Sequence, residues 1–296
     1  MSPSLLPYMI VDLHTHTNAS DGSLSPVELL SRAQAAGVQC LAITDHDTVA
    51  GHLAAAAYYT QNCSEMCLLS GIEFSCRWAA TTVHVLGLGM DCDHSAMVAG
   101  ISRLGQARLD RAEQIADRLA SRGFAGALGG AKKVAGSSQL GRPHFATWMV
   151  SQGHARDIED AFSKYLGAGK LGDVKAYWPE LAEVVQWVRS AGGIAVVAHP
   201  LKYKFTRSKL RRLLTHFVDC GGEGLEVISG RQGEQERQEL IGLACSFDLA
   251  VSAGSDFHRD SDYGPRIGVD VGFMHALDTV WKRLDERRLT MAGQVA

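Results

Sequence analysis

Short apolar runs alternate with helix-forming stretches along the first ninety residues of the chain. The apolar runs have the length of β-strands and lie at residues 9–13, 40–44, 67–72 and 83–88. The helical stretches lie at residues 26–36 and 49–60. Ser25 before Pro26 is typical of a helix start, and Gly37 is typical of a helix end. This alternation predicts β–α units with parallel strands.

The same alternation returns after residue 178. Further strands are expected at residues 194–198, 224–228 and 249–253. Further helices are expected at residues 179–191, 207–219, 233–246 and 275–288. The seven strands predict an α/β fold, in the form of a distorted seven-stranded (β/α) barrel.

The middle of the chain interrupts this pattern with helices alone. They are expected at about residues 99–121, 143–152 and 156–166, joined by glycine-rich links such as 126–130 and 136–138. We therefore predict a barrel formed by residues 1–98 and 175–296. Residues 99–174 would be a helical insertion that acts as a substrate-recognition domain, with a peripheral decoration as the alternative.

Composition narrows the class of protein. With 296 residues and 46% hydrophobic content, the chain can bury one large core, or one core and a small insert. A net charge of −3 argues against a broad nucleic-acid surface, although a local basic groove stays open. There is no leader-like N-terminal stretch, no apolar run of the ~18 residues that span a membrane, and no C-x-x-C pair. These features predict a cytoplasmic protein without a membrane partner.

Histidines and aspartates gather where the predicted strands end. In Asp12-Leu13-His14-Thr15-His16, the two histidines leave the first strand two positions apart and project toward the same side. Similar clusters, Asp45-His46-Asp47 and Asp256-Phe257-His258, follow the second and last strands. Because buried histidine and carboxylate are costly unless paired or bound to metal, the recurrence predicts a metal site. We expect Asp12, Asp45 and Asp47 to accept hydrogen bonds around the site rather than bind metal.

Other candidate ligands share this placement. Glu73 and His199 are expected at or just beyond strand ends, which converge on one face of a barrel, and Asp21 follows the first cluster in Ser20-Asp21-Gly22. His84 lies near the start of its apolar run. Its strand is therefore antiparallel, or its boundary differs from the prediction.

Together these motifs resemble the polymerase and histidinol phosphatase (PHP) superfamily. The matching segments are Asp12–His16, Ser20-Asp21-Gly22, Thr44–Asp47, Gly71-Ile72-Glu73, His84, Ala198-His199-Pro200 and Gly254–His258. Gly141-Arg142-Pro143-His144 in the insertion further resembles a bacterial subgroup that hydrolyses nucleoside 3′,5′-bisphosphates. Some members of that subgroup are 5′→3′ exoribonucleases.

The resemblance implies nine ligands for three divalent ions. The first ion would bind His14, His16, Glu73 and Asp256, the second Asp21, His46 and His258, and the third His84 and His199 while sharing Glu73. Six imidazoles and three carboxylates without a thiolate suit Mn²⁺, Zn²⁺ or Fe²⁺. Mn²⁺ is the expected metal, with Zn²⁺ and Fe²⁺ as alternatives.

The resemblance also implies a reaction. The substrate would be pAp or a similar nucleotide, and attack by a metal-bridging hydroxide would release AMP and phosphate. Asp256, His199 or a metal-bound water could protonate the leaving 3′-oxygen. Alternatives are a 5′→3′ exoribonuclease acting on short 5′-phosphorylated RNA, a histidinol-phosphate phosphatase, or a non-catalytic PHP module.

The Gly-Arg-Pro-His motif also has a physical interpretation. Proline suits the first turn of a helix, so Arg142 and His144 would flank a helix N-terminus that favours a second phosphate. A capped helix with an incidental arginine is the alternative. Lys170 and Arg231 are further candidates for substrate binding, although Arg231 could instead pair with Glu234 or Glu236. Other basic residues that could line the site are Lys132, Lys133, Lys175, Arg108 and Arg111.

Overall fold

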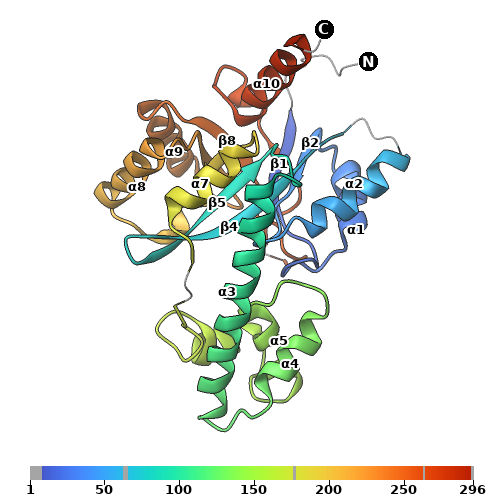
Figure 1. The fold of residues 1–296 in the computed structure, drawn as a ribbon, viewed down its shortest axis with the longest axis vertical. Coiled ribbons are helices and arrows are strands. Elements are labelled where there is room, and N and C mark those ends of the chain that lie inside the picture. Colours follow the sequence, from blue (N-terminus) through green and yellow to red (C-terminus); the bar gives the residue numbers. More distant parts are fainter. Residues whose placement is uncertain (1–8, 63–65, 176–177, 263, 295–296) are drawn as a thin grey trace.

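The computed structural model describes residues 9–62, 66–175, 178–262 and 264–294. Two mixed sheets form the centre of the α/β body, with strand orders β3-β2-β1-β9 and β4-β5-β6-β7-β8 (Figure 1). The first sheet contains β1 (Ile10–Thr15), β2 (Cys40–Ile43), β3 (Cys67–Leu69) and β9 (Val269–Asp270). The second contains β4 (Gly71–Trp78), β5 (Thr81–Leu88), β6 (Ile194–Val197), β7 (Gly224–Ser229) and β8 (Ala250–Gly254).

Among the described residues, β-bridges between the two sheets are isolated ones, Thr15–Phe257 and His46–Glu73. The predicted α/β fold is confirmed, but the predicted distorted seven-stranded (β/α) barrel is wrong, because continuous ladders join the described strands only within each of the two mixed sheets. At the first junction, the Asp256 amide donates to the His14 carbonyl at 2.8 Å. Glycine at position 254 permits this approach, since a Cβ there would lie 2.3 Å from the His14 Cβ.

Strand boundaries around β4 also differ from the prediction. The expected strand 67–72 is two strands, and Glu73 is the third residue of β4 rather than the end of a strand. β5 runs antiparallel to both β4 and β6, which confirms the antiparallel alternative for the strand that carries His84. β9 pairs with β1 over two residues and is too short to give a sequence signal.

Helices cover the sheets as the apolar spacing predicts. They are α1 (Pro26–Ala35), α2 (Ala50–Asn62), α7 (Leu181–Ser190), α8 (Arg207–Asp219), α9 (Glu234–Ser246) and α10 (Val280–Gln294), with short 3₁₀ turns η2 (Pro200–Tyr203) and η3 (Gly272–Met274). The last helix begins at Val280, so helix at residues 275–279 is wrong. Ser25 and Glu28 form a capping box at α1, as expected for that helix start. Among the described residues, no helix has both the length and the apolarity to cross a membrane.

Residues 95–166 form a helical lobe beside the sheets, connected through the long helix α3 (Figure 1). The lobe contains α3 (Ser95–Ala120), α4 (Ala127–Ala135), α5 (Arg142–Ser151), α6 (Ile158–Ala161) and the π-helical turn η1 (Phe162–Leu166). Its own core includes Leu119, Phe145 and Met149, whereas Leu104 in the first half of α3 belongs to the main core. That residues 99–174 act as a separate recognition domain stays a prediction.

The predicted link at residues 126–130 is wrong, because α4 begins at Ala127. Gly130 lies inside this helix, and a Cβ there would approach Trp148 of α5 to 2.0 Å. The glycine therefore serves close helix packing rather than a flexible connection.

Candidate metal centre

All nine predicted ligands lie in one cluster where the two sheets meet. They form four overlapping groups, and within each group the ligand atoms lie within 4.8 Å of one another. The groups are His16/Asp21/His46/His258, His14/His16/Glu73, His14/His199/Asp256 and His46/Glu73/His84. The grouping overlaps with the three predicted sets, and the division among three ions stays a prediction.

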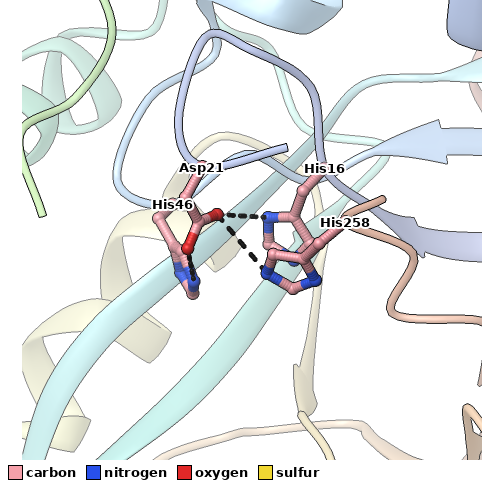
Figure 2. A group of neighbouring side chains, drawn as sticks. All are labelled: His16, Asp21, His46 and His258. Atoms are coloured by element: carbon pink, nitrogen blue, oxygen red, sulfur yellow. Dashed lines mark ion pairs between the residues drawn. The ribbon is translucent and has the colours of Figure 1, made fainter. Parts of the chain in front are cut away.

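Asp21 is the centre of the first group (Figure 2). Its Oδ1 lies 3.4 Å from His258 Nε2 and 3.9 Å from His16 Nδ1, and its Oδ2 lies 3.8 Å from His46 Nε2. Figure 2 shows the carboxylate between His46 and the His16–His258 pair. Ligand atoms about 2 Å from a shared ion lie roughly 3–4 Å apart, so these separations suit a shared cation.

At the middle of the cluster, two imidazole nitrogens face each other. His14 Nε2 and His16 Nε2 are 3.1 Å apart. Glu73 Oε2 lies 3.4 and 3.3 Å from these two nitrogens, and Asp256 Oδ1 lies 3.5 and 3.4 Å from them. The four side chains are buried, so these acceptor atoms converge on a space that a cation fits.

Glu73 connects this space to the remaining histidines. Its Oε1 lies 2.7 Å from His84 Nδ1 and 2.8 Å from His199 Nε2. Burial raises the pKa of the Glu73 carboxyl, but the charges of His46, His84 and His14 outweigh burial and hold that pKa well below its usual range. Glu73 is therefore an anion beside five imidazoles, those of His14, His16, His46, His84 and His199.

Glu226 is a buried carboxylate that the sequence analysis missed. Its Oε1 lies 2.9 Å from His14 Nδ1, and its Oε2 accepts from the His199 amide at 2.6 Å. Burial lowers the pKa of His14, but the charges of Glu226 and Glu73 outweigh it and raise that pKa to about 10. The one signal in the sequence is a charged residue inside the apolar run of β7.

A metal fits these residues by a second criterion, the buried atoms that lack a partner. Among the described residues, His16 Nδ1 and His199 Nδ1 are buried without a hydrogen bond, and so are His46 Nδ1 and Glu73 Oε2, which lie 2.9 Å apart as an ion pair. Such orphaned atoms are costly unless something else satisfies them. Divalent cations suit a set of imidazoles and carboxylates, so Mn²⁺, Zn²⁺ or Fe²⁺ all match the donors present.

The three aspartates expected to accept hydrogen bonds do so, which confirms that prediction. Asp45 accepts from the Thr17 amide at 2.7 Å and from the Ser20 hydroxyl at 2.6 Å, which fixes the loop that carries Asp21. Asp12 accepts from the amides of Ser255 and Gly268, and Asp47 accepts from the Ser75 amide and Arg108. The loops around the cluster are therefore held by buried carboxylates.

A cavity of about 550 Å³ lies between the cluster and the helical lobe. Asp21, His46 and His84 are part of its lining, which also contains the acidic Asp173, aromatic residues such as Trp178, and the cationic residues Arg108, Arg111, Arg142, Lys175 and Lys202. Arg142 donates to the Leu166 carbonyl at 3.2 Å and lies over the Phe162 ring. Burial lowers the pKa of Arg111 to about 10, and the charges of Arg142 and Arg108 act in the same direction.

The other predicted substrate contacts lie elsewhere. The helix start at Arg142 is confirmed, but His144 is buried beside the cavity and its Nδ1 accepts from the Gly141 amide at 3.0 Å. Lys170 lines a separate hollow with Arg118 and Arg122, so the structure does not bring it to the cluster.

Arg231 lines a second cavity, of about 420 Å³, which also touches His199, Asp256 and His258. In the described part of the chain Arg231 has no ion pair, and Glu234 pairs with Arg237 instead. Lys202 was not predicted. It forms an ion pair with Asp256 and follows His199 by three residues, a proximity that could have marked it.

Comparisons with known proteins agree with this geometry. The PHP domain family matches residues 12–166. The chain is 36% identical to a 3′,5′-nucleoside bisphosphate phosphatase of Chromobacterium violaceum, over 95% of this chain and 99% of that protein. It is 38% identical to a 5′-3′ exoribonuclease of Haemophilus influenzae, over 92% of this chain and 98% of that protein.

The fold is similar to a solved structure of a Chromobacterium violaceum amidohydrolase with bound sulfate and no metal. The TM-score is 0.84 at 36% identity, and the match covers 94% of this chain and 96% of that chain. The shared fold, the nearly full-length sequence similarity and the clustered histidines and carboxylates lead to one conclusion. The chain belongs to the PHP domain family and is a metal-dependent phosphoesterase of that family.

Proposed function

We propose that the protein hydrolyses the 3′-phosphate of nucleoside 3′,5′-bisphosphates, converting pAp to AMP and phosphate. The observation that carries the proposal is the cationic cavity that shares a wall with the histidine–carboxylate cluster. A substrate with two phosphates can span these two charged regions. Its 3′-phosphate would lie at the cluster and its 5′-phosphate in the cationic cavity.

The electrostatics of the cavity support a bound anion. Burial lowers the pKa of Arg111 and of Arg142, and the charge of Arg108 acts in the same direction on both, whereas the charge of Asp173 opposes it. Arg108 is paired with the buried Asp47, whereas Arg111 and Arg142 donate only to backbone carbonyls among the described residues. A phosphate dianion beside these two groups would offset their charge, and guanidinium suits phosphate geometry.

We assign the nine clustered residues to three divalent ions in the predicted sets, with Mn²⁺ as the first choice. When bound, the ions would neutralise phosphoryl oxygens and make water a stronger nucleophile. Burial lowers the pKa of His199 to about 4, so its neutral imidazole suits metal binding. Asp256 remains the candidate for moving a proton to the leaving 3′-oxygen, because its carboxylate faces both the cluster and Lys202.

A 5′→3′ exoribonuclease is the second candidate. Relatives from Haemophilus influenzae and Escherichia coli, 38% and 36% identical to this chain, carry that name. Removing a 5′-terminal nucleotide from RNA breaks the same phosphorus–O3′ bond as hydrolysis of pAp. The two activities therefore need one cluster and one pocket for the 5′-phosphate.

The decisive experiment compares pAp with 3′-AMP, which has the same scissile phosphate but no 5′-phosphate. A charge-assisted contact contributes about 1.5–3 kcal/mol, so kcat/KM should be roughly 10- to 150-fold higher for pAp. Phosphate release would be measured with Mn²⁺, Zn²⁺ and Fe²⁺, and with histidinol phosphate and short RNA as competitors. Equal kcat/KM values for pAp and 3′-AMP would contradict the proposal.

A further inference from the structure

Two cavities adjoin the cluster, and pAp accounts for only one of them. Apart from Lys202, they share no lining residue. The second cavity is bounded by η2, by the loop after β7 and by the loop after β8. Its volume of about 420 Å³ lies within the range of about 300–1,000 Å³ that small ligands occupy.

The walls of this second cavity carry polar groups that lack partners. The Ser229 side chain is only 8% exposed, and its hydroxyl has no hydrogen bond among the described residues. Arg231 is exposed and likewise makes no ion pair in the described part of the chain. The loop that carries both is fixed, because the Ser229 amide donates to Gln232 Oε1 at 2.8 Å.

Apolar surface and charge complete the cavity. Leu201 is 37% exposed, and together with Pro265 it offers carbon atoms against which a flat ring can pack. The acidic groups in the described lining are Asp256, which pairs with Lys202, and Glu236, which accepts from the Gly233 amide. Because these acidic groups have other partners, the charge of Arg231 is available to bind an anion.

We propose that this cavity binds the nucleotide that follows the cleaved bond in short 5′-phosphorylated RNA. This inference deepens the proposed function and rests on it. Leu201 and Pro265 pack against the base, and Arg231 contacts the next phosphate. The 5′-terminal nucleotide then occupies the cationic cavity, in the same position as pAp.

The reaction is the same in both substrates and differs in what the phosphorus carries. A water oxygen bonds to the scissile phosphorus, the P–O3′ bond breaks, and the 3′-oxygen takes a proton. With RNA, the products are a nucleoside 5′-monophosphate and a downstream chain that keeps the phosphate on its 5′-oxygen. With pAp, there is no downstream chain, so the phosphate leaves as the inorganic ion.

The test compares the trinucleotide pApApA with pAp for the wild type and for Arg231→Ala. The ratio of kcat/KM for pApApA over that for pAp should fall roughly 10- to 100-fold, because only the trinucleotide reaches Arg231. Arg231→Lys should restore part of the ratio, and Arg212→Ala on the exposed face of α8 should leave it unchanged. Melting temperatures would verify that each variant is folded.

Several outcomes would overturn the inference. One is an unchanged ratio for Arg231→Ala, and another is an equal loss for pAp and pApApA, which would mean that the cavity holds the 5′-phosphate. Wild-type protein that cleaves pAp but not pApApA would also overturn it while leaving the proposed function intact. Cleavage of pApApA without cleavage of pAp would contradict the proposed function alone, and the KM of pApApA in Arg231→Ala would still test the cavity.

Discussion

The histidine–carboxylate cluster and the cationic cavity beside it are built in different ways. The cluster residues sit in strands or the loops that follow them, and buried carboxylates such as Asp45 and Glu226 fix their backbone and rings. In the cavity, Arg111 and Arg142 extend from helices, and each donates to a single backbone carbonyl. The cluster is thus supported by buried hydrogen bonds on the sheets, and we predict that the helical lobe determines which substrate reaches it.

The largest expected effect concerns the ion pair that joins the two regions. Arg108 of α3 donates to Asp47 at 2.6 Å, and both side chains are buried. Arg108→Ala leaves the Asp47 charge without its partner, so the free energy of unfolding should fall by about 3–5 kcal/mol. Denaturant titration of the wild type and the variant would measure this difference in the free energy of unfolding.

The control for that experiment is Arg103→Ala on the same helix. Arg103 pairs with Glu183, but both side chains are about half exposed. Losing this exposed ion pair should lower the free energy of unfolding by only about 0–1 kcal/mol. Equal destabilisation by the two variants would mean that the Arg108–Asp47 pair does not couple the lobe to the sheets.

The second prediction concerns the cluster, where a substitution should lower kcat. Asp256 Oδ1 lies within 3.5 Å of both His14 and His16, so Asp256→Asn removes a negative charge where substrate and ions would meet. kcat for pAp should fall by about 100-fold or more. The exposed Asp260→Asn is the matched control. Near wild-type turnover in Asp256→Asn would remove Asp256 from the reaction centre.

The third prediction acts on the cavity. Arg142→Ala should raise KM for pAp by roughly 10- to 150-fold, the effect of losing about 1.5–3 kcal/mol of phosphate binding. KM for 3′-AMP should change little, because that substrate has no 5′-phosphate. Arg122→Ala, in the separate hollow of the lobe, should affect neither substrate. A parallel rise in KM for both substrates would argue for a structural role of Arg142.

The smallest expected effect is a difference in proton release. His14 has a pKa of about 10 without metal, so it is protonated at pH 8 and must lose that proton to bind a cation. Mn²⁺ affinity should therefore fall as pH falls. Glu226→Gln removes the strongest charge that raises this pKa, so metal binding should release roughly one proton fewer at pH 8. Calorimetry in buffers of different ionisation enthalpy would count the protons.

The raised pKa of His14 also makes the stability of the metal-free protein depend on pH. A histidine pKa raised from 6.5 to about 10 stabilises the folded state below pH 6.5. That contribution is lost as pH rises toward 10. If the Glu226→Gln variant releases as many protons as the wild type, Glu226 does not control the charge of His14.

The cluster could be predicted because its residues occur in short local motifs. His14 and His16, or Asp256 and His258, are two positions apart, so each pair lies together at the end of one strand or in the loop just beyond it. The sequence analysis did not identify Glu226, because a single carboxylate in an apolar strand has no partner nearby in the sequence. Its partners, His14 and the His199 amide, lie 212 and 27 residues away.

The division of the strands into two sheets could not be predicted for a related reason. Strand pairing across β1 and β8, or β2 and β4, depends on contacts between distant segments, and only isolated bridges form there. The hairpin β4–β5 also reverses the direction of one strand, which an alternation of apolar runs does not reveal. Gly130 shows the same limit in the lobe, because its purpose is set by Trp148 on another helix.

The junction between β1 and β8 has a consequence for the newly made chain. His14 emerges from the ribosome early, and its carbonyl accepts from the Asp256 amide, which is made 242 residues later. Contacts so far apart in sequence form late in folding and carry a large cost in loop closure. During translation His14 and His16 therefore lack their contacts with Asp256 until that residue has been synthesised. A growing chain cannot assemble the complete cluster, and so cannot act as a phosphoesterase, until β8 and the loop beyond it have been made.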